Sequence, residues 1–117
     1  MTPKRGDHVA PPAVEDQWHI RFADAAAAKG WEELCRQAPG NTNRAWHIMR
    51  DHPSPATQDP RHHRLRPPLH AGTFQGMALD RRQLEVTGGG RVWYLVDRDR
   101  HTVWIDYAGA GHPRETA

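Results

Sequence analysis

Arginine and histidine are the side chains of this sequence that are best suited to chemistry on a phosphate. The 16 basic residues are 14 arginines and 2 lysines, against 14 acidic residues. Arginine binds phosphate through a planar fork of donors, so this balance suits a nucleic-acid ligand, although a GC-rich genome also enriches arginine together with Ala, Gly and Pro. Five arginines and one acid, Asp80, lie between Arg61 and Arg82. We expect this segment to be the electrostatic centre of the chain.

The histidines could also bind a metal. Four of them, His62, His63, His70 and His112, could cluster around zinc, since neutral imidazole is a zinc ligand. No cysteine pair, His-Glu-x-x-His pattern or aspartate-rich loop accompanies them, so we expect no metal and no other cofactor. The single cysteine, Cys35, has no partner for an internal disulfide and is expected to be a small core residue.

Length and composition favour one domain with a thin core. The 117 residues are 37% hydrophobic, with a mean hydropathy of −0.89. Residues 1–16 are charged, contain proline and lack periodicity, so we expect a flexible tail followed by a domain over residues 17–117. No apolar run reaches the roughly 20 residues of a membrane helix, and no secretory signal is present, so we expect a cytoplasmic protein without a membrane partner.

The hydrophobic periodicity must place these side chains on an α+β fold. Alternation predicts a strand over residues 18–22, and helical spacing then predicts helices over 24–38 and from about 41 to 52. Four prolines favour a loop, or at best an edge segment of the sheet, over 54–69. Alternation returns over 84–87 and 102–107, and the segment 91–96 between them is apolar on both faces, as in a central strand. With turns between them, these three segments predict a three-stranded antiparallel meander.

Several short motifs occupy this order of elements. They are Trp18-His19-Ile20-Arg21-Phe22, Lys29-Gly30-Trp31, His63-Arg64-Leu65, Gly90-Arg91-Val92-Trp93-Tyr94-Leu95-Val96-Asp97, and Tyr107-Ala108-Gly109-Ala110-Gly111-His112-Pro113-Arg114. With them the sequence from Trp18 to Arg114 resembles the RelE/ParE family of toxins from type II toxin–antitoxin systems. The resemblance implies a β-α-α-β-β-β fold, in which a curled antiparallel sheet carries two helices packed on one face.

The same resemblance implies a function. RelE-branch toxins cut messenger RNA in the ribosomal decoding site without a metal, and ParE-branch toxins poison DNA gyrase. Both are silenced by a cognate antitoxin, which also provides their indirect link to DNA. The expected function is therefore a ribosome-dependent messenger-RNA endoribonuclease that inhibits translation. A non-catalytic ParE-like gyrase inhibitor and a degenerate toxin that only binds its antitoxin are the alternatives.

The resemblance also nominates site residues. It implies that His112 transfers a proton while Arg91 and Arg114 stabilise charge at the cleaved phosphate. It further implies an RNA-binding group of three residues, His63, Arg64 and Arg66.

The sequence departs from the family pattern in two places. Residues 73–82 resemble an insertion, and the C-terminal segment lacks the aromatic residue that some active relatives have. Tyr107 or Tyr94 could substitute for that aromatic residue.

Overall fold

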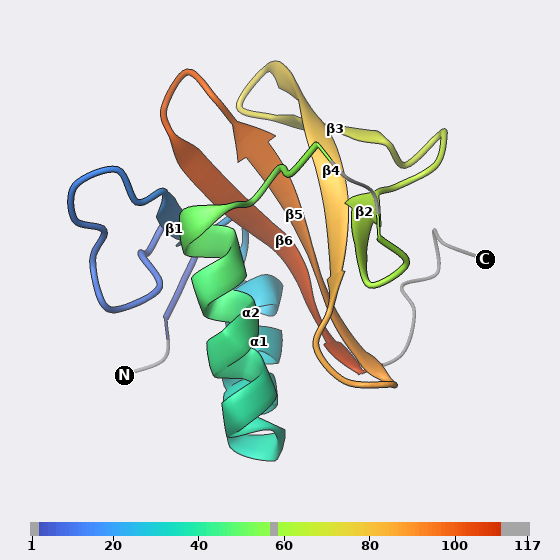
Figure 1. Ribbon diagram of the computed structural model, residues 1–117. Helices are drawn as coiled ribbons and strands as arrows, with labels where there is room; N and C mark the ends of the chain where they lie inside the picture. The colour runs from blue at the N-terminus through green and yellow to red at the C-terminus, as the bar shows by residue number, and fades with distance from the viewer. Residues whose placement is uncertain (1–2, 57–58, 111–117) are drawn as a thin grey trace.

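Three long strands in the second half of the chain form the centre of a six-stranded sheet (Figure 1). The computed structural model describes residues 3–56 and 59–110. In it, β4 (Met77–Glu85), β5 (Gly90–Asp97) and β6 (Thr102–Ala110) form an antiparallel meander. The short strand β1 (His19–Phe22) pairs in parallel with β6 and begins the sheet. The predicted meander, and the prediction that residues 18–22 join the sheet, are confirmed.

Two helices of 13 residues each cover one face of this sheet. Helix α1 (Ala25–Gln37) begins after Asp24, whose carboxylate accepts a hydrogen bond from the Ala27 amide at 2.7 Å. Helix α2 (Pro39–Asp51) follows after one residue and begins with proline, whose missing N–H is not needed there. The predicted helices are therefore present, and the prediction of an α+β fold with a mostly antiparallel sheet is confirmed.

The hydrophobic core lies between the helices and what we call the helix-covered face of the sheet. Its members come from both helices and from β1, β4, β5 and β6, and they include Ile20, Phe22, Trp31, Leu34, Met49, Val92 and Ile105. Helix α1 lies very close to β6, because a Cβ atom added at Gly30 would stand 1.9 Å from the Ala108 carbonyl oxygen. Cys35, expected in this core, is exposed instead, because it lies outside the buried stripe of α1.

The far edge of the sheet contains two short strands that pair with the same side of β4. Strand β2 (His62–Arg64) lies within the segment expected to be a loop or at best an edge segment, and it forms an edge of the sheet. Strand β3 (Ala71–Phe74) forms a hairpin with the beginning of β4. Its turn consists of Gln75 and Gly76, whose φ angles of 51° and 79° suit a tight two-residue hairpin turn. The apparent insertion at 73–82 is therefore an extension of the sheet.

The segment expected to be a flexible tail differs from that expectation where it is described. Residues 3–16 fold back on β1, with hydrogen bonds from the Val9 amide to the Ile20 carbonyl (2.8 Å) and from the Phe22 amide to the Asp7 carbonyl (3.0 Å). The Val9 side chain is buried in the core. The segment thus covers the edge of β1 that β6 does not occupy. No helix in the described part of the chain is long and apolar enough to cross a membrane.

Candidate functional site

The face of the sheet turned away from the helices, the helix-free face, brings together side chains from distant parts of the sequence. Strand register determines which residues share a row, because side chains alternate between faces. One row across the sheet consists of His63, Gln83, Trp93 and Tyr107. A second row consists of Arg81, Leu95, Trp104 and Arg21. Cationic and aromatic side chains therefore dominate this face.

A β-bulge in β6 adds a carboxylate to the helix-free face. Trp93 pairs with Tyr107, but the next residue of β5, Tyr94, pairs with Ile105, so Asp106 is an extra residue. A bulge reorients the side chains of the strand that carries it. Tyr107 approaches the Trp93 ring, with 5.9 Å between centroids, while Asp106 reaches across to Arg81 on β4. The bulge thus places two consecutive polar side chains on the same face.

Arg81 and Asp106 form an ion pair on this face. The Nε and Nη2 atoms of Arg81 both donate to Asp106 Oδ2 at 2.9 Å. Arg81 also donates to the Leu69 carbonyl at 3.3 Å, and its guanidinium lies 5.7 Å from the centre of the Trp93 ring. Gly72 makes room for this arrangement, since a Cβ atom there would meet Arg81 Nη2 at 2.5 Å. The guanidinium is therefore fixed on four sides.

Burial makes this ion pair chemically unusual. The side chains of Arg81 and Asp106 are only 18% and 15% exposed. Burial raises the pKa of Asp106, and the attraction of Arg81 opposes that rise. The second carboxylate oxygen, Oδ1, is buried and has no hydrogen-bond partner among the described residues. An unsatisfied carboxylate oxygen beside a fixed guanidinium is a feature that functional sites often have.

The two tryptophans of this face support arginines. The Trp93 Nε1–H donates to Gln83 Oε1 at 2.9 Å, and only 4% of Trp93 is exposed. Trp104 is 3% exposed, and the Arg21 guanidinium lies 5.1 Å from its ring centre. Neither ring is exposed enough to stack on a nucleic-acid base in this conformation. Both instead hold a guanidinium by a cation–π contact.

Of the residues nominated from the sequence, Arg91 and His63 belong to the helix-free face. Arg91 pairs with Glu85 and Gly109 at the beginning of β5, one alternation from Trp93. It is 9% exposed, and its Nε atom has no hydrogen-bond partner within the described chain. His63 lies two strands away, and sheet spacing puts its Cα on the order of 12 Å from that of Arg91. Its Nδ1 atom is also buried without a described partner.

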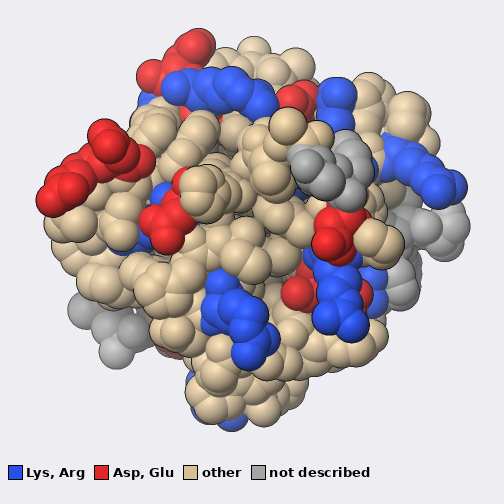
Figure 2. Space-filling model, in the orientation of Figure 1, with Lys and Arg blue, Asp and Glu red and all other residues tan. Residues whose placement is uncertain are grey.

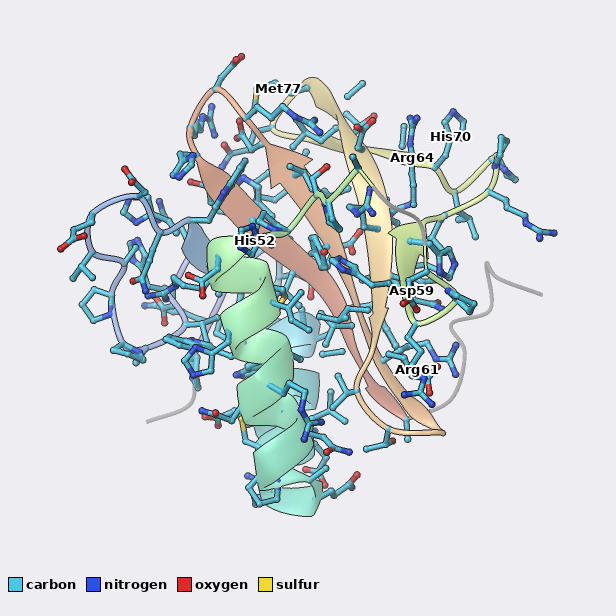
Figure 3. The ribbon with its side chains drawn as sticks, viewed as in Figure 1. His52, Asp59, Arg61, Arg64, His70 and Met77 are labelled. Atoms are coloured by element: carbon cyan, nitrogen blue, oxygen red, sulfur yellow. The ribbon has the colours of Figure 1, made fainter. Side chains whose placement is uncertain are left out.

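The other nominated residues lie elsewhere. Arg64 forms an ion pair with Asp80 at 2.9 Å and donates to the His70 carbonyl at 3.2 Å, at the outer edge of the sheet (Figure 3). Arg66 is exposed in the turn after β2. His112 and Arg114 lie outside the described residues, so their roles stay predictions. The nominated residues that are described thus divide between the helix-free face and the sheet edge.

Next to β2 lies a groove of about 610 Å³ on the helix-covered side. Figure 3 shows His52 at the end of α2 and, across the groove, Asp59 and Arg61 beside β2. Its charges are mixed, and Figure 2 shows that basic and acidic side chains are interspersed over this side of the molecule. The basic segment expected to be the electrostatic centre is therefore divided between two faces and partly neutralised by Asp80.

A buried polar pair borders this groove. The Tyr94 hydroxyl donates to the Pro53 carbonyl at 2.6 Å, so its oxygen accepts a hydrogen bond from His62 Nε2. Burial and the nearby Arg82 lower the pKa of His62 to about 4, while burial raises the pKa of Tyr94. His62 is therefore neutral at pH 7. Tyr94 is fully buried and structural, which leaves Tyr107 as the tyrosine on the helix-free face.

Sequence reasoning missed the Arg81–Asp106 pair. The two residues are 25 positions apart, and only the bulge and the register bring them together. The described residues contain no group of three or more His, Cys, Asp or Glu side chains arranged to hold a metal ion. Comparison of the chain with protein-family models, curated proteins and solved structures finds no match.

Proposed function

We propose that this protein is a RelE/ParE-like toxin of a type II toxin–antitoxin system, acting in the cytoplasm as a ribosome-dependent messenger-RNA endoribonuclease. The observation that carries the proposal is the Arg81–Asp106 pair on the helix-free face, with Tyr107 beside it and Arg91 and His63 on the same face. The strand–helix–helix order followed by the meander supports the family. A cognate antitoxin would silence the protein and provide its indirect contact with DNA.

The proposed reaction needs only protein side chains. The ribose 2′-oxygen loses its proton and attacks phosphorus, the P–O5′ bond breaks, and the leaving 5′-oxygen takes up a proton. The products are a 2′,3′-cyclic phosphate and a 5′-hydroxyl. His112 would transfer the proton, because imidazole titrates near neutral pH. Arg91 and Arg114 would stabilise the extra negative charge that develops at phosphorus.

Arg81 and Asp106 extend this assignment. Asp106 holds two of the guanidinium nitrogens of Arg81, so we assign Asp106 as a positioning residue. The fixed guanidinium contributes positive charge without paying the entropy of ordering a long side chain when RNA binds. His63 on the helix-free face, with Arg64 and Arg66 at the sheet edge, would contact the RNA backbone outside the cleavage point.

The test is cleavage of a reading-frame RNA on programmed ribosomes. Protein treated with EDTA and returned to magnesium buffer should cut as well as untreated protein. His112→Ala should slow cleavage by about 10²–10⁴-fold without loss of ribosome binding. Arg91→Lys should also reduce the rate, because a point charge cannot reproduce the bidentate fork. The matched control is Lys29→Gln combined with Arg36→Gln, since both residues are exposed on α1.

Each outcome has a defined meaning. Near-parental cutting by His112→Ala would remove His112 from the mechanism. Loss of cutting after EDTA treatment, restored by zinc, would replace the reaction with a metal-dependent one. If transcripts stay intact on ribosomes while gyrase supercoiling is inhibited by the same protein, the ParE-like alternative takes the place of the endoribonuclease. If neither target is affected but the antitoxin binds, the protein is a degenerate toxin.

A further inference from the structure

A second cationic site lies near β1, away from the Arg81–Asp106 pair. Three arginines and two histidines line one hollow of about 500 Å³, and they are Arg5, His8, His19, Arg21 and Arg100. They come from the N-terminal segment, from β1 and from the turn between β5 and β6. No aspartate or glutamate is among the described residues that line the hollow. Folding therefore concentrates positive charge that is dispersed in the sequence.

Arg21 is fixed at the inner wall of this hollow. Its Nε–H donates to the Gly6 carbonyl at 2.8 Å, and one face of its guanidinium lies against the buried Trp104 ring. Within the described chain, its two terminal nitrogens have no hydrogen-bond partner. Because the Arg21 side chain is already ordered, binding an anion to these donors costs little side-chain conformational entropy.

Arg100 and Arg5 form the outer wall. Arg100 is 47% exposed, donates to Gln75 Oε1 at 2.6 Å and has Asp97 at 3.7 Å from its Nε atom. Asp97 is 1% exposed and accepts a hydrogen bond from Trp104, so it partly offsets the charge of Arg100, and Asp7 acts in the same sense beside His8. Arg5 is exposed. The positive charges therefore outnumber the negative ones around the hollow.

Two histidines also line this hollow. The His8 and His19 rings lie edge to face with 5.8 Å between centroids. Burial, followed by the charge of Arg21, lowers the pKa of His8, so this imidazole is uncharged at pH 7. An anion in the hollow would oppose the effect of Arg21 and raise the pKa of His8. His8 can therefore report on whether the hollow is occupied.

We propose that this hollow binds a phosphate group of a single-stranded oligonucleotide. Guanidinium forks match phosphate oxygens in geometry and charge, and exposed phosphodiesters are supplied by a nucleic-acid chain. The choice of RNA as the source rests on the proposed function, whereas phosphate binding by the hollow does not. The segment expected to be a tail thus contributes two lining residues of this hollow, Arg5 and His8.

The experiment titrates the full chain with three probes, which are inorganic phosphate, adenosine 5′-monophosphate and a five-nucleotide oligouridylate without terminal phosphates. The site variant is Arg5→Gln with Arg100→Gln, both exposed residues, and the control is Lys29→Gln with Arg36→Gln, which removes the same charge from α1. In the parent, oligouridylate binding should weaken with salt. The site variant should lower the affinity for oligouridylate at least about tenfold at low salt and reduce the log–log salt slope by about 0.7, corresponding to one lost phosphate contact.

The control variant should change the affinity for oligouridylate less than about twofold. In the parent, NMR should show the His8 imidazole titrating at higher pH when the oligonucleotide is bound. Equal losses in both variants would show a net-charge effect and overturn the proposal, as would an unchanged His8 titration. Binding of phosphate and adenosine monophosphate as tight as that of oligouridylate would overturn the oligonucleotide source. If the site variant binds oligouridylate as tightly as the parent and ribosomal cleavage persists, this inference alone is refuted. If the parent binds oligouridylate in the hollow but does not cut RNA on ribosomes, only the proposed function is refuted.

Discussion

The substitution Gly30→Ala tests a close contact between helix α1 and the sheet. An added Cβ atom would stand 1.9 Å from the Ala108 carbonyl oxygen and 2.8 Å from its carbonyl carbon. Ordinary carbon–oxygen contacts are at about 3.3 Å or longer, so α1 would have to retreat by roughly 1.4 Å. A gap of that size removes much of the dispersion attraction across the interface, where Ala27, Trp31 and Leu34 are buried.

Two effects of opposite sign determine the outcome. Replacing glycine by alanine inside a helix favours folding by about 1 kcal/mol through backbone entropy. Forcing an extra carbon into a packed interface costs about 1–3 kcal/mol, and contact with backbone, which cannot rotate away, places Gly30 at the upper end. We therefore expect Gly30→Ala to lower the free energy of unfolding by about 2 kcal/mol. This corresponds to a melting temperature roughly 6–10 °C lower for a chain of this length.

Gly40→Ala is the matched control, because a Cβ atom at Gly40 in α2 would meet nothing within 4 Å. Only the entropy term remains, so the free energy of unfolding should rise by about 0.5–1 kcal/mol. Urea denaturation followed by tryptophan fluorescence measures both variants. Equal or greater stability of Gly30→Ala relative to the parent would refute the packing of α1 against the Ala108 carbonyl, whatever Gly40→Ala does.

Three further predictions concern buried polar groups. Arg50 is 1% exposed and donates to the Pro11 carbonyl at 2.7 Å. Arg50→Met should therefore lower the free energy of unfolding by about 2–4 kcal/mol and speed proteolysis of the N-terminal segment. An unchanged proteolytic pattern would argue against a role of Arg50 in holding this segment. The pKa of His62 is about 4 in the folded protein and about 6.5 in the unfolded chain, so the unfolded chain binds more protons between these two pH values. The free energy of unfolding should therefore fall by about 2–3 kcal/mol as the pH drops from 6.5 to 4. His62→Phe should flatten that slope in pH-dependent urea melts, whereas substitution of the exposed His47 by glutamine should leave it intact. Asp106→Asn should reduce the cleavage rate while the protein stays folded, and a parental rate would remove Asp106 as a positioning residue.

The central strands and the helices were predictable because their patterns are local. In β5 and β6 the apolar residues that reach the helix-covered face recur at every second position, as Val92, Tyr94 and Val96 do. In α1, Trp31 and Leu34 follow the spacing of one helical face, and Asp24 supplies the cap at its beginning. Each of these signals needs only neighbours within one element, so no knowledge of the tertiary structure was required.

The strand predicted at 84–87 begins seven residues after the true beginning of β4 at Met77, because the apolar pattern of β4 changes face along its length. Leu79 packs on the helix-free face with the small cluster of Leu95 and Trp104, whereas Leu84 packs in the main core. Between them, Arg82 occupies a buried position on the helix-covered side. Alternation within one window detects strands that bury a single face, so a strand that contributes to two clusters escapes detection.

The N-terminal segment was missed for a different reason. Its order depends on contacts with residues far along the chain, including Arg50, which donates to the carbonyls of both Val9 and Pro11. A single buried valine and a row of carbonyl acceptors leave no periodic signal. Composition therefore indicated a tail, although the segment forms part of the cationic hollow beside β1.

The density of charge along the sequence was a poor guide to the site, because adjacent positions of a strand point to opposite faces. Arg81 and Arg82 are neighbours, yet Arg81 binds Asp106 on the helix-free face and Arg82 is buried beside Tyr94 under the helices. Arg64 pairs with Arg82 in the strand register and forms an ion pair with Asp80 at the edge of the sheet. The five arginines that lie close together in the sequence thus occupy several different environments in the fold. The Arg81–Asp106 pair and the hollow around Arg21 arise instead from residues on neighbouring strands. In both places the guanidinium lies against a tryptophan ring, Trp93 for Arg81 and Trp104 for Arg21, and the strand register was needed to identify these partners.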